Sequence, residues 1–129
     1  MRLTNNFKLR EFQCKCGCEM PAEVLVEVKK LAEELQDIRD FIGRSITINS
    51  AYRCKAHNKA QKGKFNSQHL LGKAADLNPS DLSAEGLFRT LEVLTQFGYI
   101  LDGGIGIYNT FVHYDIRDTH ARWNNTTRN

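Results

Sequence analysis

Hydrophobic residues recur at helical spacing immediately after Pro21. Six apolar residues are separated by steps of three and four, which places them on one face of a helix: Val24, Val28, Leu31, Leu35, Ile38 and Ile42. A proline in the first turn and Gly43 after the last apolar position mark the two ends. The pattern therefore predicts a helix between Pro21 and Gly43 with one buried face.

The rest of the chain alternates short strand and helix patterns. Residues 45–52 place Ile46 and Ile48 between polar neighbours, the period of a half-buried strand. The other predicted elements are a helical turn from Cys54 toward Gln61, a strand over 74–77, a helix carrying Leu87, Leu91 and Leu94 that ends at Gly98, and strands over 99–101, 105–108 and 111–116. This order does not repeat a βαβ unit and favours an α+β fold, with a small antiparallel sheet flanked by helices.

Length and composition narrow the class of protein. The chain has 129 residues, of which 41% are hydrophobic and 26% charged, so we expect residues 1–129 to form one domain. No apolar run is long enough to predict a membrane span. The net charge is +3 with the basic residues scattered, which disfavours a nucleic-acid partner. The first residues lack an apolar secretory stretch, so we expect cytoplasmic synthesis without a signal peptide. We also expect a monomer.

Three of the four cysteines fall in one short segment. Cys14, Cys16 and Cys18 are separated by single residues, and Cys54 stands alone. Near neighbours do not easily meet disulfide geometry, so a bridge from the cluster to Cys54 is the favoured interpretation. A zinc ion bound by all four cysteines is the alternative.

The first candidate for chemistry is the pair His69 and Asp76. On a continuous helix, seven residues would separate them by about 10.5 Å along the axis, too far for one ion whose ligand bonds are near 2 Å. The chain must therefore fold back between them. Gly72 provides a flexible point, and the small Ala74 and Ala75 leave room for a strand that delivers Asp76.

A second candidate lies in the strand predicted over 111–116. The period of two places His113 and Asp115 on one face, which wastes burial unless that face lines a cleft. Trp123 is expected in the core or on the floor of that cleft. The set of His69, Asp76 and His113, with a fourth position left to water, has the composition of a catalytic zinc site.

These motifs resemble a known family. The segments are Ser67-x-His69-x-x-Gly72-x-Ala74-x-Asp76, His113-x-Asp115 and the upstream Ser50-Ala51-Tyr52-Arg53. They occur in the order found in the zinc D-Ala-D-Ala carboxypeptidases and related phage-type peptidoglycan peptidases, whose fold is shared with the hedgehog signalling domain. The resemblance extends over residues 7–123.

The resemblance implies roles for individual residues. It assigns zinc to His69, Asp76 and His113, and it assigns a substrate carboxylate to Arg53, whose planar guanidinium suits a bidentate contact. Ser67 is expected either to hydrogen-bond substrate or to cap the turn before His69.

One position departs from the family pattern. Many relatives carry their catalytic acid three residues before the last zinc histidine, where this chain has Thr110. Asp115 is the first choice for the general base, and Asp102, beside a Gly-Gly turn, is the second. A third interpretation makes Asp115 an orienting partner of a zinc-binding histidine.

The resemblance implies a zinc metallopeptidase that hydrolyses peptide bonds of peptidoglycan stem peptides. It leaves open a D-Ala-D-Ala carboxypeptidase or an endopeptidase, and a phage or prophage endolysin that acts at the bacterial cell wall once released. The alternative is a catalytically inactive, zinc-containing peptidoglycan-binding module. Thr110, in place of the catalytic acid, favours that alternative, and Asp115, as a candidate general base, disfavours it.

Overall fold

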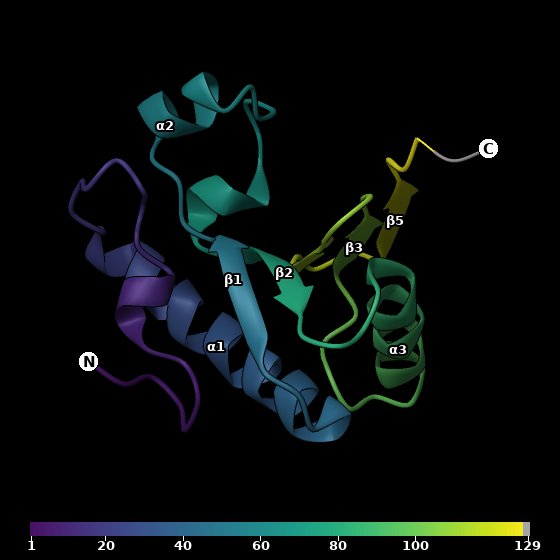
Figure 1. The fold of residues 1–129 in the computed structure, drawn as a ribbon. Coiled ribbons are helices and arrows are strands. Elements are labelled where there is room, and N and C mark those ends of the chain that lie inside the picture. The colour runs from purple at the N-terminus through teal and green to yellow at the C-terminus, as the bar shows by residue number, and fades with distance from the viewer. Residues whose placement is uncertain (128–129) are drawn as a thin grey trace.

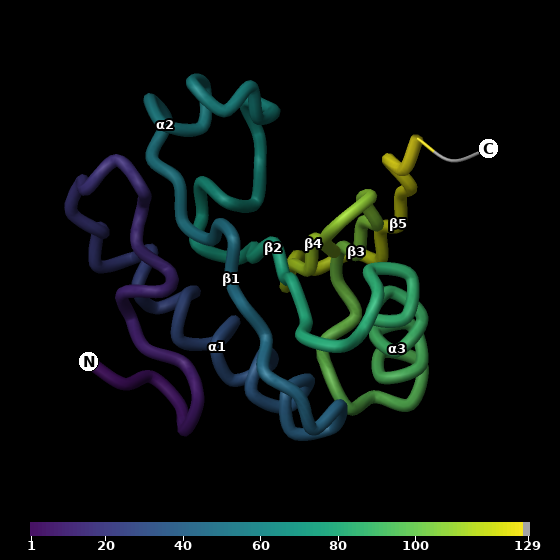
Figure 2. The backbone as a smooth tube through the Cα atoms, viewed as in Figure 1, coloured from purple at the N-terminus to yellow at the C-terminus, as the bar shows by residue number. Residues whose placement is uncertain are grey.

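The computed structural model describes residues 1–127 and confirms the α+β fold (Figure 1). In chain order the elements are η1 (Leu9–Glu11), α1 (Ala22–Ile42), β1 (Ile46–Ser50), α2 (Lys55–Ala60), η2 (Gln68–Leu71), β2 (Ala74–Pro79), α3 (Ala84–Gln96), β3 (Gly104–Ile107), β4 (Val112–Asp115) and β5 (Ala121–Asn124), where η denotes a 3-10 helix. The tube in Figure 2 follows the chain from β1 through α2 and back into β2. The segment with η2 thus connects two paired strands.

The five strands form one sheet in the order β1-β2-β4-β3-β5. All neighbours are antiparallel, as predicted, except β3 and β5, whose parallel pairing makes the sheet mixed at this edge. The reason is topological. The chain reverses after β3 to make β4, reverses again after β4, and then pairs β5 with the far side of β3, which runs in the same direction.

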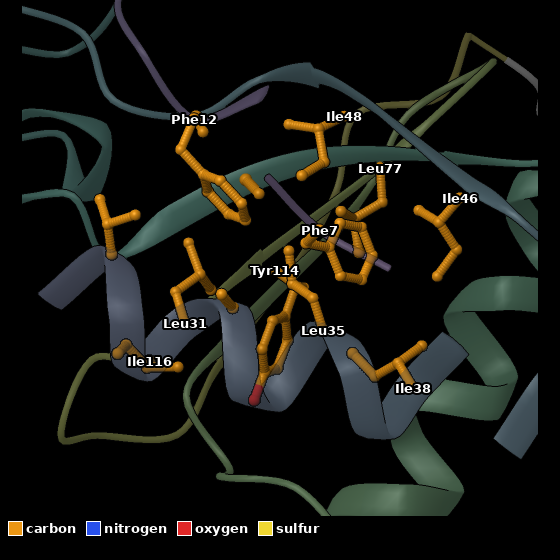
Figure 3. Close-up of a cluster of buried hydrophobic side chains, with 14 of the residues drawn as sticks. Phe7, Phe12, Leu31, Leu35, Ile38, Ile46, Ile48, Leu77, Tyr114 and Ile116 are labelled. Atoms are coloured by element: carbon orange, nitrogen blue, oxygen red, sulfur yellow. The ribbon is translucent and has the colours of Figure 1, made fainter. Parts of the chain in front are cut away.

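Helix α1 fills the core with the apolar face predicted from the sequence. Leu31, Leu35 and Ile38 are fully buried, and Figure 3 shows them directed toward Leu77 of β2 and Tyr114 of β4. The helix ends at Gly43, whose φ of 66° is the left-handed conformation that glycine adopts readily. The predicted helix is therefore confirmed at both ends. Although α1 is long, no helix within residues 1–127 is apolar enough to cross a bilayer.

Two segments differ from the predicted secondary structure. Residues 99–101 are not a strand, because their backbone is used elsewhere: Tyr99 N–H donates to the Leu94 carbonyl, and Leu101 N–H donates to the Glu34 carboxylate on α1. Residues 121–124 form β5, which was not predicted: Ala121 and Trp123 alternate with polar residues, but over four positions only. Pairing with β3 supplies the order that local sequence does not.

The cysteines also differ from the favoured interpretation. Cys14, Cys16, Cys18 and Cys54 are free thiols, so the predicted bridge to Cys54 is wrong. The four sulfur atoms gather into one group instead of pairing.

Candidate metal centre

Three elements bring His69, Asp76 and His113 together. His69 comes from η2, while Asp76 of β2 and His113 of β4 are directly opposed in the sheet register. Asp76 Oδ1 lies 3.3 Å from His69 Nε2 and 3.3 Å from His113 Nδ1. The donor atoms of all three lie within 4.8 Å of one another, close enough for a single ion.

The fold-back predicted between His69 and Asp76 takes place at Gly72. The Ser67 hydroxyl caps η2 by accepting the His69 backbone N–H at 3.1 Å, and Gly72 ends η2 with a φ of 76°. An alanine methyl at Gly72 would also overlap Val24 of α1. A short capped turn and one left-handed glycine therefore return the chain to β2 within a few residues.

His69 is held in the tautomer that a metal requires. Its Nδ1 donates to the Ala51 carbonyl at 2.6 Å, because a carbonyl oxygen only accepts. Nε2 therefore has a free lone pair, and it is buried without a hydrogen-bond partner within the part of the chain that the structure describes. A buried, unpartnered nitrogen beside a carboxylate fits a bound zinc ion, which would restore the missing interaction.

Electrostatics agree with this fit. Burial alone would raise the pKa of the Asp76 carboxyl, but the close imidazoles of His113 and His69 hold that pKa well below its usual range. Asp76 is thus an ionised carboxylate aimed at both imidazoles. An anion between two imidazoles is a suitable ligand set for a divalent cation.

Asp115 lies on the other side of the His113 ring. His113 Nε2 donates to Asp115 Oδ2 at 2.6 Å, which leaves Nδ1 to face Asp76. The Asp115 side chain is fully buried, and burial alone would raise its pKa; the hydrogen bonds from His113 and Arg117 instead hold that pKa well below normal. Asp115 is thus an ionised group whose contact with the centre runs through His113.

Two residues that were not predicted as site residues from the sequence surround the Asp115 carboxylate. Arg117 donates from Nε to Oδ1 at 2.9 Å and from Nη2 to Oδ2 at 2.7 Å, and Gly104 N–H donates to Oδ1 at 2.9 Å. A Cβ on Gly104 would overlap the carboxylate. Two features of the sequence could have indicated them: the spacing of Asp115 and Arg117, and the alternation of glycine with isoleucine over 104–107.

The same alternation makes room for Trp123. In the sheet register Asp76, His113, Gly106 and Trp123 form one row across four strands. A Cβ on Gly106 would overlap the indole, so glycine lets Trp123 lie over β3 with its ring 5.0 Å from that of His113. Trp123 is therefore a wall of the site. Its Nε1 donates to the Tyr108 hydroxyl at 3.0 Å.

Arg53 stands beside the centre. Its backbone N–H donates to the His69 carbonyl at 3.1 Å, and its side chain is half-buried. Burial lowers the pKa of the guanidinium, while the nearby Asp76 and Tyr108 oppose that shift. Its Nε has no hydrogen-bond partner among the described residues. A buried donor of this kind is suited to a carboxylate from outside the chain.

The two remaining candidate site residues, Ser67 and Asp102, make other contacts. Ser67 caps η2, as one of the two expectations held. Asp102 is exposed and accepts from Arg122 Nη2 at 2.6 Å and from His120 Nδ1 at 3.0 Å, and the His120 contact is the main reason that its pKa is low. Asp102 does not belong to the group of metal-ligating atoms around His69.

Comparison with known proteins assigns the chain to a class. The model of the family Peptidase M15 matches residues 4–115, so the chain belongs to that family. The match includes the segments that carry Arg53, His69, Asp76 and His113. No curated protein matched the sequence. Membership supports, at the level of the family, a zinc-dependent peptidase of peptidoglycan.

Proposed function

We propose that this chain is a zinc peptidase that hydrolyses peptide bonds in peptidoglycan stem peptides. The observation that carries the proposal is the triad of His69, Asp76 and His113 in a Peptidase M15 chain. The buried His69 Nε2 without a hydrogen-bond partner gives it chemical support.

The three ligands would hold zinc, and each has a supporting contact. Bound there, zinc polarises a carbonyl and lowers the pKa of water, which supplies the electrophile and nucleophile for peptide hydrolysis. The Ala51 carbonyl fixes the His69 ring so that Nε2 faces Asp76. Asp115 fixes the His113 ring in the same way, by accepting from Nε2 and leaving Nδ1 free.

Asp115 therefore acts through His113 in this proposal. Its two oxygens accept from His113, Gly104 and Arg117, and its side chain is inaccessible to solvent. A general base must come within hydrogen-bond reach of the proton that it takes. The positioning role, which the sequence left as a third interpretation, explains these contacts better than the role of base.

Arg53 would bind a substrate carboxylate. A guanidinium pairs with a carboxylate through two parallel hydrogen bonds and so fixes register as well as charge. Stem peptides offer such groups at the terminal D-alanine and within the chain, so the contact fits a D-Ala-D-Ala carboxypeptidase and an endopeptidase. Trp123 and Tyr108 would form the apolar wall along which the substrate lies.

We also propose a biological context in which this peptidase acts. A small catalytic domain directed at stem peptides is suited to a phage or prophage endolysin, which is made in the cytoplasm and reaches the cell wall after release. This assignment rests on the family resemblance.

The test is digestion of purified peptidoglycan by the zinc-loaded protein, followed by mass spectrometry of the released fragments. Release of free D-alanine would identify a carboxypeptidase, and release of larger stem fragments an endopeptidase. The matched control is His113→Ala, for which we expect no cleavage with the fold retained. Absence of any new peptide terminus with the zinc-loaded protein would refute the proposal.

One observation favours a second function, a catalytically inactive peptidoglycan-binding module. Neither candidate base is free at the centre, because Asp115 is occupied behind His113 and Asp102 pairs with Arg122 and His120. Such a module would sediment with cell walls and leave every peptide bond intact. The digestion experiment therefore separates the two functions.

A further inference from the structure

A second group of metal-ligating atoms lies apart from the His69 triad. Cys14, Cys16 and Cys18 follow η1, and Cys54 is the residue immediately before α2. The four Sγ atoms all lie within 4.8 Å of one another. The fold thus gathers every cysteine of the chain from two segments that are far apart in sequence.

The separations among three of the sulfurs are close to those of a tetrahedral site. The Sγ atoms of Cys14 and Cys16 are 3.3 Å apart, those of Cys16 and Cys54 are 3.6 Å apart, and those of Cys14 and Cys54 are 3.9 Å apart. Four sulfurs at about 2.3 Å from one zinc ion would be separated by about 3.8 Å. The observed separations bracket this value.

The backbone is arranged to present these sulfurs. Gly17, with a φ of 86°, closes a turn in which its N–H donates to the Cys14 carbonyl at 3.0 Å, so the chain reverses within the segment that carries Cys14, Cys16 and Cys18. On the other segment, the His57 N–H donates to Cys54 Sγ at 3.4 Å. Backbone N–H groups commonly support sulfur ligands in this way.

We propose that Cys14, Cys16, Cys18 and Cys54 bind a structural zinc ion. Four thiolates complete the coordination of zinc and leave no position for water or substrate, as in structural sites and unlike catalytic ones. Thiolate ligands also favour zinc over magnesium or calcium. The chain would then carry two zinc ions with different tasks.

The position of this site gives it a consequence for the catalytic centre. Cys54 follows Arg53, whose backbone N–H donates to the His69 carbonyl at 3.1 Å. In the same segment, Tyr52 N–H donates to the Phe12 carbonyl at 3.0 Å. A metal that joins the cysteine segments therefore fixes the backbone that carries Arg53 and contacts His69.

The first experiment measures zinc per chain in protein purified without chelator. We expect two zinc ions in the native chain, one in Cys16→Ser and one in His113→Ala. Cys16 is exposed, so its replacement leaves the core intact. The exposed neighbour Lys15→Ser is the matched control and should retain both ions. Native protein with one zinc ion that is lost in His113→Ala would overturn the proposal, as would iron in place of zinc.

Two further readouts do not depend on activity. Cobalt substituted into the native chain and into His113→Ala should give thiolate-to-cobalt charge-transfer absorption, which Cys16→Ser should lose. A thiol reagent should react slowly with the native protein and should find all four cysteines after denaturation with a chelator. Fewer thiols, with an intact mass reduced by two hydrogens per bridge, would establish disulfides instead. These outcomes stand whether or not the protein cleaves peptidoglycan.

Discussion

Replacement of Asp115 by asparagine is expected to weaken zinc binding through a change in His113. Asp115 Oδ1 accepts from Gly104 N–H and from both the backbone N–H and Nε of Arg117, so the asparagine oxygen will occupy that side. The new amide NH₂ then takes the place of Oδ2 and faces His113 Nε2. Two donors would meet there, and His113 can relieve this only by moving its proton to Nδ1.

The magnitude follows from the loss of that lone pair. His113 Nδ1 is the nitrogen 3.3 Å from Asp76 Oδ1, and a protonated nitrogen cannot bind a metal. Loss of a carboxylate that orients a ligand histidine lowers metal affinity by about 10- to 100-fold, which is about 1.4–2.7 kcal/mol. Arg117 also loses its ionised partner, so we expect a decrease of about 1–3 kcal/mol in the free energy of unfolding.

The assay is peptidase activity as a function of buffered free zinc. A positioning role predicts that Asp115→Asn needs about 10- to 100-fold more zinc for half-maximal activity and approaches the native plateau in excess zinc. A general-base role predicts an unchanged zinc dependence and a plateau lowered by about two to four orders of magnitude. The control is Asp102→Asn, the same change in an exposed carboxylate, which should alter neither. Native behaviour of Asp115→Asn in both respects would refute the reasoning.

Two further variants test the substrate side of the site. Arg53→Lys keeps the charge but loses the planar fork, so kcat/KM for a substrate with a free carboxylate should fall by at least about tenfold, or ~1.4 kcal/mol, and unchanged kinetics would remove Arg53 from substrate binding. Ser67→Ala removes the cap of η2 and should lower the free energy of unfolding by about 1 kcal/mol in a urea titration while KM stays constant. An increase in KM with native stability would instead show that the Ser67 hydroxyl contacts substrate.

The sequence predicted those features that depend on local spacing. The apolar period of α1, the proline before it and Gly43 after it define a helix with no reference to the rest of the chain. The need for a fold-back between His69 and Asp76 followed from the length of a helix, and the turn at Gly72 satisfies it.

Features that depend on tertiary pairing were not predicted. Strand β5 alternates apolar and polar residues over only four positions, too few to predict a strand, and its order depends on pairing with β3. The environment of Asp115 requires Gly104, which lies on a neighbouring strand, and Arg117, whose side chain folds back on the carboxylate. The period of two correctly placed His113 and Asp115 on one face, but it could not show that the carboxylate is buried.

The cysteines illustrate the same limit. Spacing within the cluster excluded easy bridges between neighbours, which left Cys54 as the expected partner. Sequence does not show that a turn at Gly17 and the start of α2 bring all four sulfurs to one point. That arrangement contradicts the expected bridge and supports the proposed zinc site.

The most direct test of the central claim is anomalous diffraction at the zinc absorption edge from a crystal of the zinc-loaded protein. We predict a peak bound by His69 Nε2, a carboxylate oxygen of Asp76 and His113 Nδ1, with Asp115 still hydrogen-bonded to His113 Nε2. A zinc peak on Asp115, or no peak among His69, Asp76 and His113, would contradict the account.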